Sequence, residues 1–95
     1  MKCAIISPSG REEFQDISSI HLVTPTGEME ILSGHVAVVT ALKGGQTLRL
    51  RAANQLIRCT LAPGSFIRFE NDAAEVLSAQ YSFEKEQAAG EEQKA

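Results

Sequence analysis

The chain has 95 residues, a formal net charge of −3 and a hydrophobic content of 43%. This length suits one domain with one modest core, and the hydrophobic content excludes a wholly disordered chain. The acidic balance argues against non-specific binding to nucleic acid or to an anionic membrane surface.

Cys3 and Cys59 are the only cysteines of the chain. Their spacing matches neither a CxxC redox pair nor a structural zinc motif, so we expect two reduced, buried thiols. The apolar run near the start is too short for a secretory signal. No window approaches the ~18 apolar residues of a membrane-spanning helix, so work at a membrane would depend on another subunit.

The first half of the chain reads as short strands separated by turns. Strands are expected at residues 3–7, 17–23, 28–32 and 36–42, the last being a continuous apolar run. Turns are expected at Pro8-Ser9-Gly10 and at Thr24-Pro25-Thr26-Gly27, which has the Pro and Gly positions of a type I turn. The polar segment 11–16 is expected to be a loop in which Phe14 plugs the core. His21 is expected to face away from the core.

The second half predicts two hairpins. The first spans 47–61 and turns at Ala53-Asn54, with apolar and polar residues alternating along both arms. The second pairs 66–70 with 74–79 around Glu70-Asn71-Asp72. Short strands with frequent turn signals predict an all-β fold, a flattened antiparallel sandwich or barrel of about 8–10 strands.

The composition changes after residue 80. We therefore expect a β-sandwich domain at 1–80 and a short polar tail at 81–95. Residues 82–89 could form two helical turns, but isolated helices of this length are marginal in water. The tail is expected to be partly helical or disordered.

Catalytic patterns are missing from the sequence. His21 and His35 have no spacing that suits a metal site or a nucleophile with its base. Glu28 and Glu30 share a strand face and are expected to be solvated carboxylates. There is no phosphate-binding glycine loop. We therefore expect no enzyme activity, no metal and no cofactor.

Two alternative functions stay open on the residues alone. Lys43 lies beside a turn and could be the modified lysine of a small carrier domain. A nucleic-acid module is the other alternative, because four arginines could cluster on one sheet face. Those arginines are Arg49, Arg51, Arg58 and Arg68.

Short motifs occur in a fixed order along most of the chain. They are Ser7-Pro8, Phe14, Gly27-Glu28, Ile31-Leu32, Gly34-His35, Val38-Val39-Thr40, Ala41-Leu42-Lys43, Gly45, Gly64-Ser65-Phe66 and Asn71 to Leu77. In this order the chain resembles the N-terminal β-sandwich of the epsilon subunit of F-type ATP synthases, over about residues 2–80. Departures from that pattern are Glu30 in place of a Gly, Ser33 and Val36 in place of prolines, and Gly44 in place of a Pro.

The resemblance implies a non-catalytic rotor subunit of the central stalk, one that grips the gamma subunit and sits on the membrane c-ring. Glu28 and its neighbours Met29, Glu30 and Ser33 would then face the c-ring. Ser7, His35 and Thr40 would lie toward gamma. Family members commonly add a C-terminal helical hairpin, for which this chain leaves too few residues, so its inhibitory and ATP-binding roles are expected to be absent. The expected location is the cytoplasmic face of the membrane, reached through other subunits.

Overall fold

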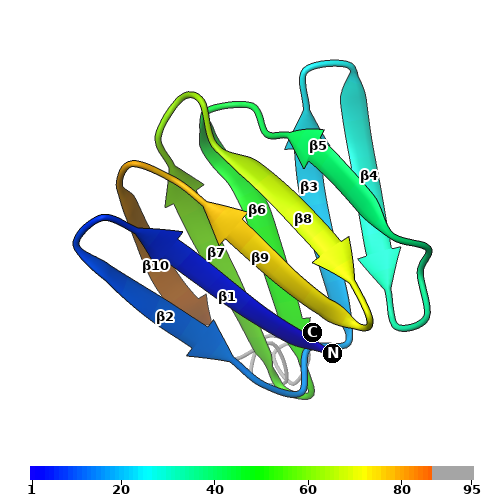
Figure 1. The fold of residues 1–95 in the computed structure, drawn as a ribbon. Coiled ribbons are helices and arrows are strands. Elements are labelled where there is room, and N and C mark those ends of the chain that lie inside the picture. The colour runs from blue at the N-terminus through cyan, green and yellow to red at the C-terminus, as the bar shows by residue number, and fades with distance from the viewer. Residues whose placement is uncertain (87–95) are drawn as a thin grey trace.

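The computed structural model in Figure 1 describes residues 1–86, which form ten strands and no helix. Over these residues there is accordingly no helix able to cross a membrane. The strands are β1 Lys2–Ser7, β2 Gly10–Phe14, β3 Ser19–Thr24, β4 Gly27–Leu32, β5 Val38–Ala41, β6 Gly45–Ala52, β7 Gln55–Leu61, β8 Phe66–Glu70, β9 Ala73–Leu77 and β10 Tyr81–Glu86.

The strands form two five-stranded sheets that face each other (Figure 1). Sheet A has the order β2-β1-β9-β8-β5, and sheet B has the order β10-β7-β6-β3-β4. Each strand pair is antiparallel except β1 with β9, which run parallel in sheet A. The all-β sandwich expected from the sequence is confirmed, and the parallel pair is a feature that the turn pattern did not indicate.

Buried apolar residues alternate with exposed residues along the strands, and the buried ones form a single core between the sheets. In β6, Leu48 and Leu50 are fully buried, whereas Arg49 and Arg51 lie on the outer face. Successive side chains of a strand point to opposite faces, so one apolar phase from each sheet fills the interior. The buried cluster includes Cys3, Ile5, Phe14, Ile17, Ile20, Leu22, Ile31, Leu42, Leu48, Leu50, Ile57, Cys59, Leu61, Ile67, Phe69, Ala74 and Val76.

Both cysteines belong to this core as free thiols, as the sequence predicted. Cys3 lies in sheet A and Cys59 in sheet B. Burial raises the pKa of each thiol to about 12. Desolvation disfavours the thiolate, so neither sulfur is a nucleophile near neutral pH.

Two expectations for the first half are corrected. The segment 11–16 is not a loop, since β2 covers Gly10–Phe14, although Phe14 is buried as expected. The apolar run 36–42 is strand only at Val38–Ala41, and Val36 and Val39 are 75% and 66% exposed. The chain crosses from sheet B to sheet A between β4 and β5. Val36 and Val39 therefore belong to the surface, whereas Val38 packs against the core.

The carboxyl-terminal expectation is also corrected. Residues 82–86, expected to begin a helix, belong to β10, and sheet B therefore continues past the boundary that we placed at residue 80. Phe83 packs on Phe14 with ring centroids 5.4 Å apart, which joins the β10 edge of sheet B to the β2 edge of sheet A. The remainder of the expected helix, 87–89, lies outside the described residues.

Candidate partner-binding surface

One row of side chains crosses the outer face of sheet A and is apolar from β1 to β5. Ile6 pairs in register with Leu77, Leu77 with Phe66, and Phe66 with Ala41. Leu77 and Phe66 are 37% and 41% exposed. We call these four residues the apolar row. Registered neighbours on one sheet face lie within contact distance, so the row is a continuous apolar strip open to solvent.

The next row on the same face is charged but internally neutralised. Arg68 donates from Nη2 to Glu75 Oε1 at 2.7 Å and from Nη1 to Glu70 Oε1 at 3.2 Å. The Arg68 hydrogen bond, followed by its charge, lowers the pKa of Glu75. Val39 ends this row on β5, opposite Arg68. A partner covering the face would meet apolar atoms and a satisfied ion cluster rather than free charge.

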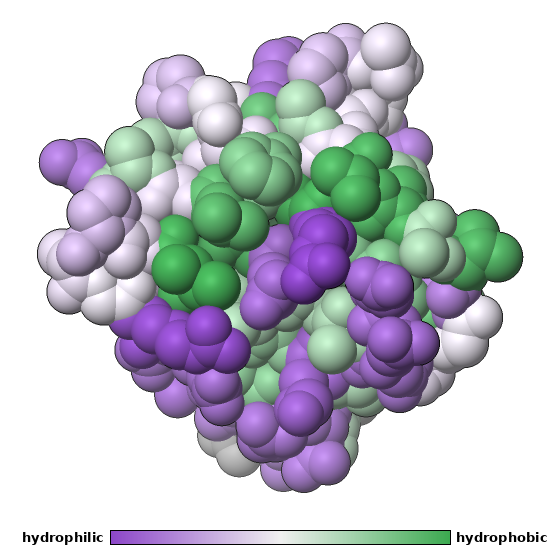
Figure 2. Space-filling model, in the orientation of Figure 1, coloured by the Kyte–Doolittle hydropathy of each residue, from purple (hydrophilic) through white to green (hydrophobic). Residues whose placement is uncertain are grey.

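A shallow depression of about 480 Å³ lies at the end of the apolar row, between Ile6, Phe66 and Leu77 and the turn residues Pro8 and Pro63. Figure 2 shows hydrophobic side chains gathered in a band across this face, over the ends of β1, β9 and β8 and onto β5, with a hydrophilic group between them. Exposed apolar surface that is contiguous and edged by polar residues marks a binding site for another macromolecule.

The connection from β4 to β5 is held in place by Asp72, from the turn between β8 and β9. Asp72 Oδ1 accepts hydrogen bonds from the Gly34 amide and from Ser33 Oγ, both at 3.1 Å. The Gly34 bond, followed by the Ser33 bond, lowers the pKa of Asp72. Asn71 and Asp72 have φ values of 54° and 59°, as the central residues of a type I′ hairpin turn require. This tie fixes the connection between the sheets against the end of sheet A.

His35 is a structural residue of the same connection. Its Nδ1 lies 2.7 Å from the Val36 carbonyl oxygen, which can only accept, so Nδ1 carries the proton. The ring packs edge-on against Phe69 with centroids 6.1 Å apart. His35 is half-buried as a result, and only part of its ring could touch a partner.

The structure does not bring the seven predicted partner-binding residues into one site. Ser7 lines the depression beside the apolar row, and Thr40 lies on β5 with its side chain on the inner side, opposite Ile67. His35 and Ser33 lie in the connection between β4 and β5. The remaining three are on β4, where Glu28 and Glu30 are exposed on the outer face of sheet B and Met29 packs against the core.

The predicted arginine cluster is wrong for one of its four members. Arg49, Arg51 and Arg58 lie on the outer face of sheet B, but Arg68 is on β8 in sheet A, on the opposite side of the molecule. Lys43 is exposed, and its amide donates to the Val23 carbonyl at 2.9 Å.

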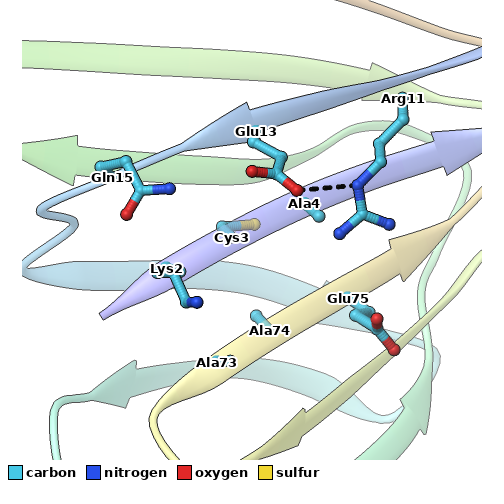
Figure 3. Close-up of a pocket in the computed structure, with 9 residues that line it drawn as sticks. All are labelled: Lys2, Cys3, Ala4, Arg11, Glu13, Gln15, Ala73, Ala74 and Glu75. Atoms are coloured by element: carbon cyan, nitrogen blue, oxygen red, sulfur yellow. Dashed lines mark hydrogen bonds and ion pairs between the residues drawn. The ribbon is translucent and has the colours of Figure 1, made fainter.

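A second hollow on sheet A, of about 160 Å³, has charged walls and no catalytic arrangement. Figure 3 shows the Arg11 Nε to Glu13 Oε2 contact of 2.8 Å on one wall, with Lys2 and Glu75 on the others. Cys3 lies beneath it with a buried thiol. Nowhere in residues 1–86 do three or more metal-ligating side chains gather.

Sequence reasoning missed the apolar row, although a signal for it was present. β1 contains Ala4 and Ile6 as well as Cys3 and Ile5, and β8 contains Phe66 as well as Ile67. A strand that is apolar in both phases has more hydrophobic side chains than one core can use. Reading both phases of β1, β8 and β9 would have pointed to this face.

Comparison with known proteins gives one family and several structures. A family model described as "ATP synthase, Delta/Epsilon chain, beta-sandwich domain" matches residues 1–83. A chain in the central stalk/c-ring structure of the Tetrahymena thermophila mitochondrial ATP synthase is similar in fold, with TM-score 0.69 and 16% identity over 86% of this chain and 65% of that one. A chain of the Euglena gracilis mitochondrial ATP synthase (OSCP/F1/c-ring, rotational state 1) has TM-score 0.75 and 18% identity over 85% and 51%. The chain thus spans less than two thirds of either neighbour, and no curated protein matches it in sequence.

Proposed function

The chain belongs to the β-sandwich domain family of ATP synthase delta/epsilon chains, and from that premise we propose that it is a non-catalytic stalk subunit of an F-type ATP synthase. In this role it couples a gamma subunit to the membrane c-ring and turns with both during ATP synthesis and ion transport. It is held at the cytoplasmic face of the membrane through these partners.

The observation that carries the proposal is the apolar row on the outer face of sheet A. We assign the gamma subunit to this face, since the contiguous apolar strip at the centre and neutralised charges beside it are typical of a protein–protein contact. Ser7 follows Ile6 on β1 and lines the depression beside the row, and Thr40 precedes Ala41 on β5 with its side chain on the inner side. His35 lies in the connection before β5, packed on Phe69. Ser7 would contact gamma at the rim of the row, and a contact that extends along β5 would also reach Thr40 and His35.

The c-ring is assigned to the β4 edge of sheet B. Glu28 and Glu30 are exposed there, and Ser33 follows at the end of the strand, with Met29 anchoring it to the core. The two sheets share one close-packed interior, and such interiors have low compressibility. A load applied at the β4 edge would therefore reach the outer face of sheet A without large deformation between them.

The test is co-expression of this chain with a cognate gamma subunit, followed by size-exclusion chromatography and a binding titration. We expect the native chain to co-elute with gamma and Leu77→Ser to weaken the complex about tenfold or more, because central apolar contacts dominate interface energies. Leu32→Ser is the matched control, since Leu32 is a 52% exposed leucine on sheet B and its loss should leave gamma binding unchanged.

Two results would reject the proposal. One is a chain that ignores gamma and every other rotor component offered to it. The other is equal weakening by Leu77→Ser and Leu32→Ser, which would place the contact elsewhere than the apolar row.

A further inference from the structure

A cleft of about 330 Å³ opens on the outer face of sheet B, on the opposite side of the sandwich from the apolar row. Its centre is a row of basic side chains on three adjacent strands, in which His21 of β3 pairs in register with Arg49 of β6, and Arg49 pairs with Arg58 of β7. Two guanidinium groups directly opposite each other repel, so this pair gains from any group that bridges it with negative charge.

His21 connects two charged side chains of the cleft, Arg49 and Glu28. Arg49 Nη2 lies 2.9 Å from His21 Nδ1 and 3.4 Å from Nε2, so the guanidinium lies against the imidazole ring. His21 Nε2 lies 2.7 Å from Glu28 Oε1, and a carboxylate only accepts, so Nε2 donates this hydrogen bond. Arg49 has no carboxylate within salt-bridge distance anywhere in residues 1–86.

Two further polar groups of the cleft lack partners. Arg58 pairs with Glu86 through Nη1 at 3.2 Å, but its Nε is buried without a hydrogen bond among the described residues. Thr47 is only 5% exposed, and its Oγ1 is buried without a partner as well. Thr47 lies where the register between β6 and β7 shifts, and bulges of this kind redirect a side chain. Buried polar groups without partners are uncommon in folded proteins, and water, an ion or a ligand can supply the missing partner.

We propose that this cleft binds a phosphate group, either inorganic phosphate or the phosphate of a small monoester, between Arg49 and Arg58 with Thr47 Oγ1 as a further donor. A phosphate offers several acceptor oxygens, which can serve two guanidinium groups and a hydroxyl at once. Glu28 lies on one side of Arg49, beyond His21, and Glu86 pairs with Arg58 on the other, so the anion would lie between the two guanidinium groups. The exposed aromatic residue Phe66 lies on the other sheet, so a base-stacking platform does not accompany this site.

The experiment is an NMR titration of the isotope-labelled full chain with sodium phosphate, against sodium chloride at equal ionic strength and pH. Saturable shifts are expected at Thr47, Arg49 and Arg58, including the Arg58 Nε–H signal, with phosphate and not with chloride. Arg49→Gln should weaken binding about tenfold or more, because it removes the guanidinium that has no carboxylate partner. Arg11→Gln is the matched control on sheet A and should leave the affinity unchanged.

Thr47→Val tests the hydroxyl separately, since it keeps the shape of the side chain. It should reduce phosphate affinity severalfold without lowering the unfolding midpoint, because the hydroxyl has no partner to lose. Phenyl phosphate as a second ligand separates the two sources, since tighter binding than phosphate assigns the site to a monoester and weaker binding assigns it to the free ion. Shifts that do not saturate, that chloride reproduces, or that survive Arg49→Gln unchanged would overturn the proposal. Gamma binding lies on sheet A, so its success or failure is a separate result.

Discussion

The outer faces of the two sheets are built on the same alternation but have opposite chemistry. On sheet A the outward phase is apolar along Ile6, Leu77 and Phe66, and its main charge, Arg68, is held between two carboxylates. On sheet B the outward phase carries arginines, and Arg49 lies against His21 and opposite Arg58. Both inner faces are equally apolar.

The inner faces of the sheets stabilise the fold, whereas the outer faces determine which molecules it can bind. The inner phases of both sheets are hydrophobic residues that form one core. The outer phases are not required by the core, so their contrast indicates two kinds of contact. An apolar strip gains by excluding water against another protein, whereas an uncompensated guanidinium gains by meeting an anion.

The largest expected effect is on the reactivity of the two thiols. Their reactivity tests whether the inner faces of the two sheets are equally inaccessible to solvent. Both pKa values are raised to about 12 from 9.0, so the thiolate fraction at pH 8 falls about 1000-fold for Cys3 and for Cys59. Iodoacetamide labelling followed by mass spectrometry should leave both unmodified in the native chain and modify both in guanidinium. Thr60→Cys, an exposed outward position on β7, is the control and should react quickly. Rapid labelling of only one thiol in the native chain would mean that the inner face of that sheet is accessible to solvent.

A smaller effect should distinguish the inner phase from the outer phase by stability. Leu50→Ala empties a fully buried position and should reduce the free energy of unfolding by about 3 kcal/mol. Leu77→Ala, on the apolar row, should cost about 1 kcal/mol or less, because much of that side chain is already exposed. Urea unfolding measures both. Similar losses in the free energy of unfolding would show that the apolar row stabilises the fold as the core does. The contrast between inner and outer faces would then be contradicted.

The smallest effect is expected on the melting temperature of an Asp72 variant. The Asp72 carboxylate accepts hydrogen bonds from the connection between β4 and β5. Its pKa is lowered by hydrogen bonds to the carboxylate, so the stability it contributes is present above the ordinary carboxyl value of 3.8. That contribution is lost as the pH falls through the lower pKa of the folded state. The melting temperature of Asp72→Asn should therefore lie slightly below the native one near pH 6, and the gap should close below about pH 3.8.

Asp16→Asn is the control for this measurement, because the Asp16 carboxylate has no hydrogen-bond partner in the described part of the chain. Its melting temperature should follow the native curve at each pH. A gap for Asp72→Asn that widens toward low pH would contradict the assigned direction of the Asp72 pKa.

Local patterns predicted the strands well, because alternation at 47–61 and turn signals at Asn71 and Asp72 are short-range physical constraints. The parallel pairing of β1 with β9 was not predictable in this way, since it joins segments about 70 residues apart with no local turn between them. Residues 82–86 failed as a helix for the same reason. Pairing with β7 outweighs a weak helical preference in so short a segment.

The candidate site was predictable only in part. Ser7, His35 and Thr40 came from the resemblance. Ser7 lies beside the apolar row, whereas the Thr40 side chain is on the inner side of β5 and His35 lies in the connection before β5. The apolar row depends on registers across four strands, and no single strand reveals those registers. The Arg49 and Arg58 pair has the same origin, while the position of Arg68 on the opposite side could be known only after the strands had been assigned to sheets.

The parallel seam between β1 and β9 has a consequence for how the chain is made. β1 can pair with β2 as soon as that hairpin leaves the ribosome, but its other edge has no partner until Ala73–Leu77 has been synthesised. Throughout that interval the free edge of β1 can pair with other chains. Pairings between segments this far apart in sequence also form slowly. Nascent chains stalled before residue 73 should accordingly bind chaperones more strongly than chains released beyond it.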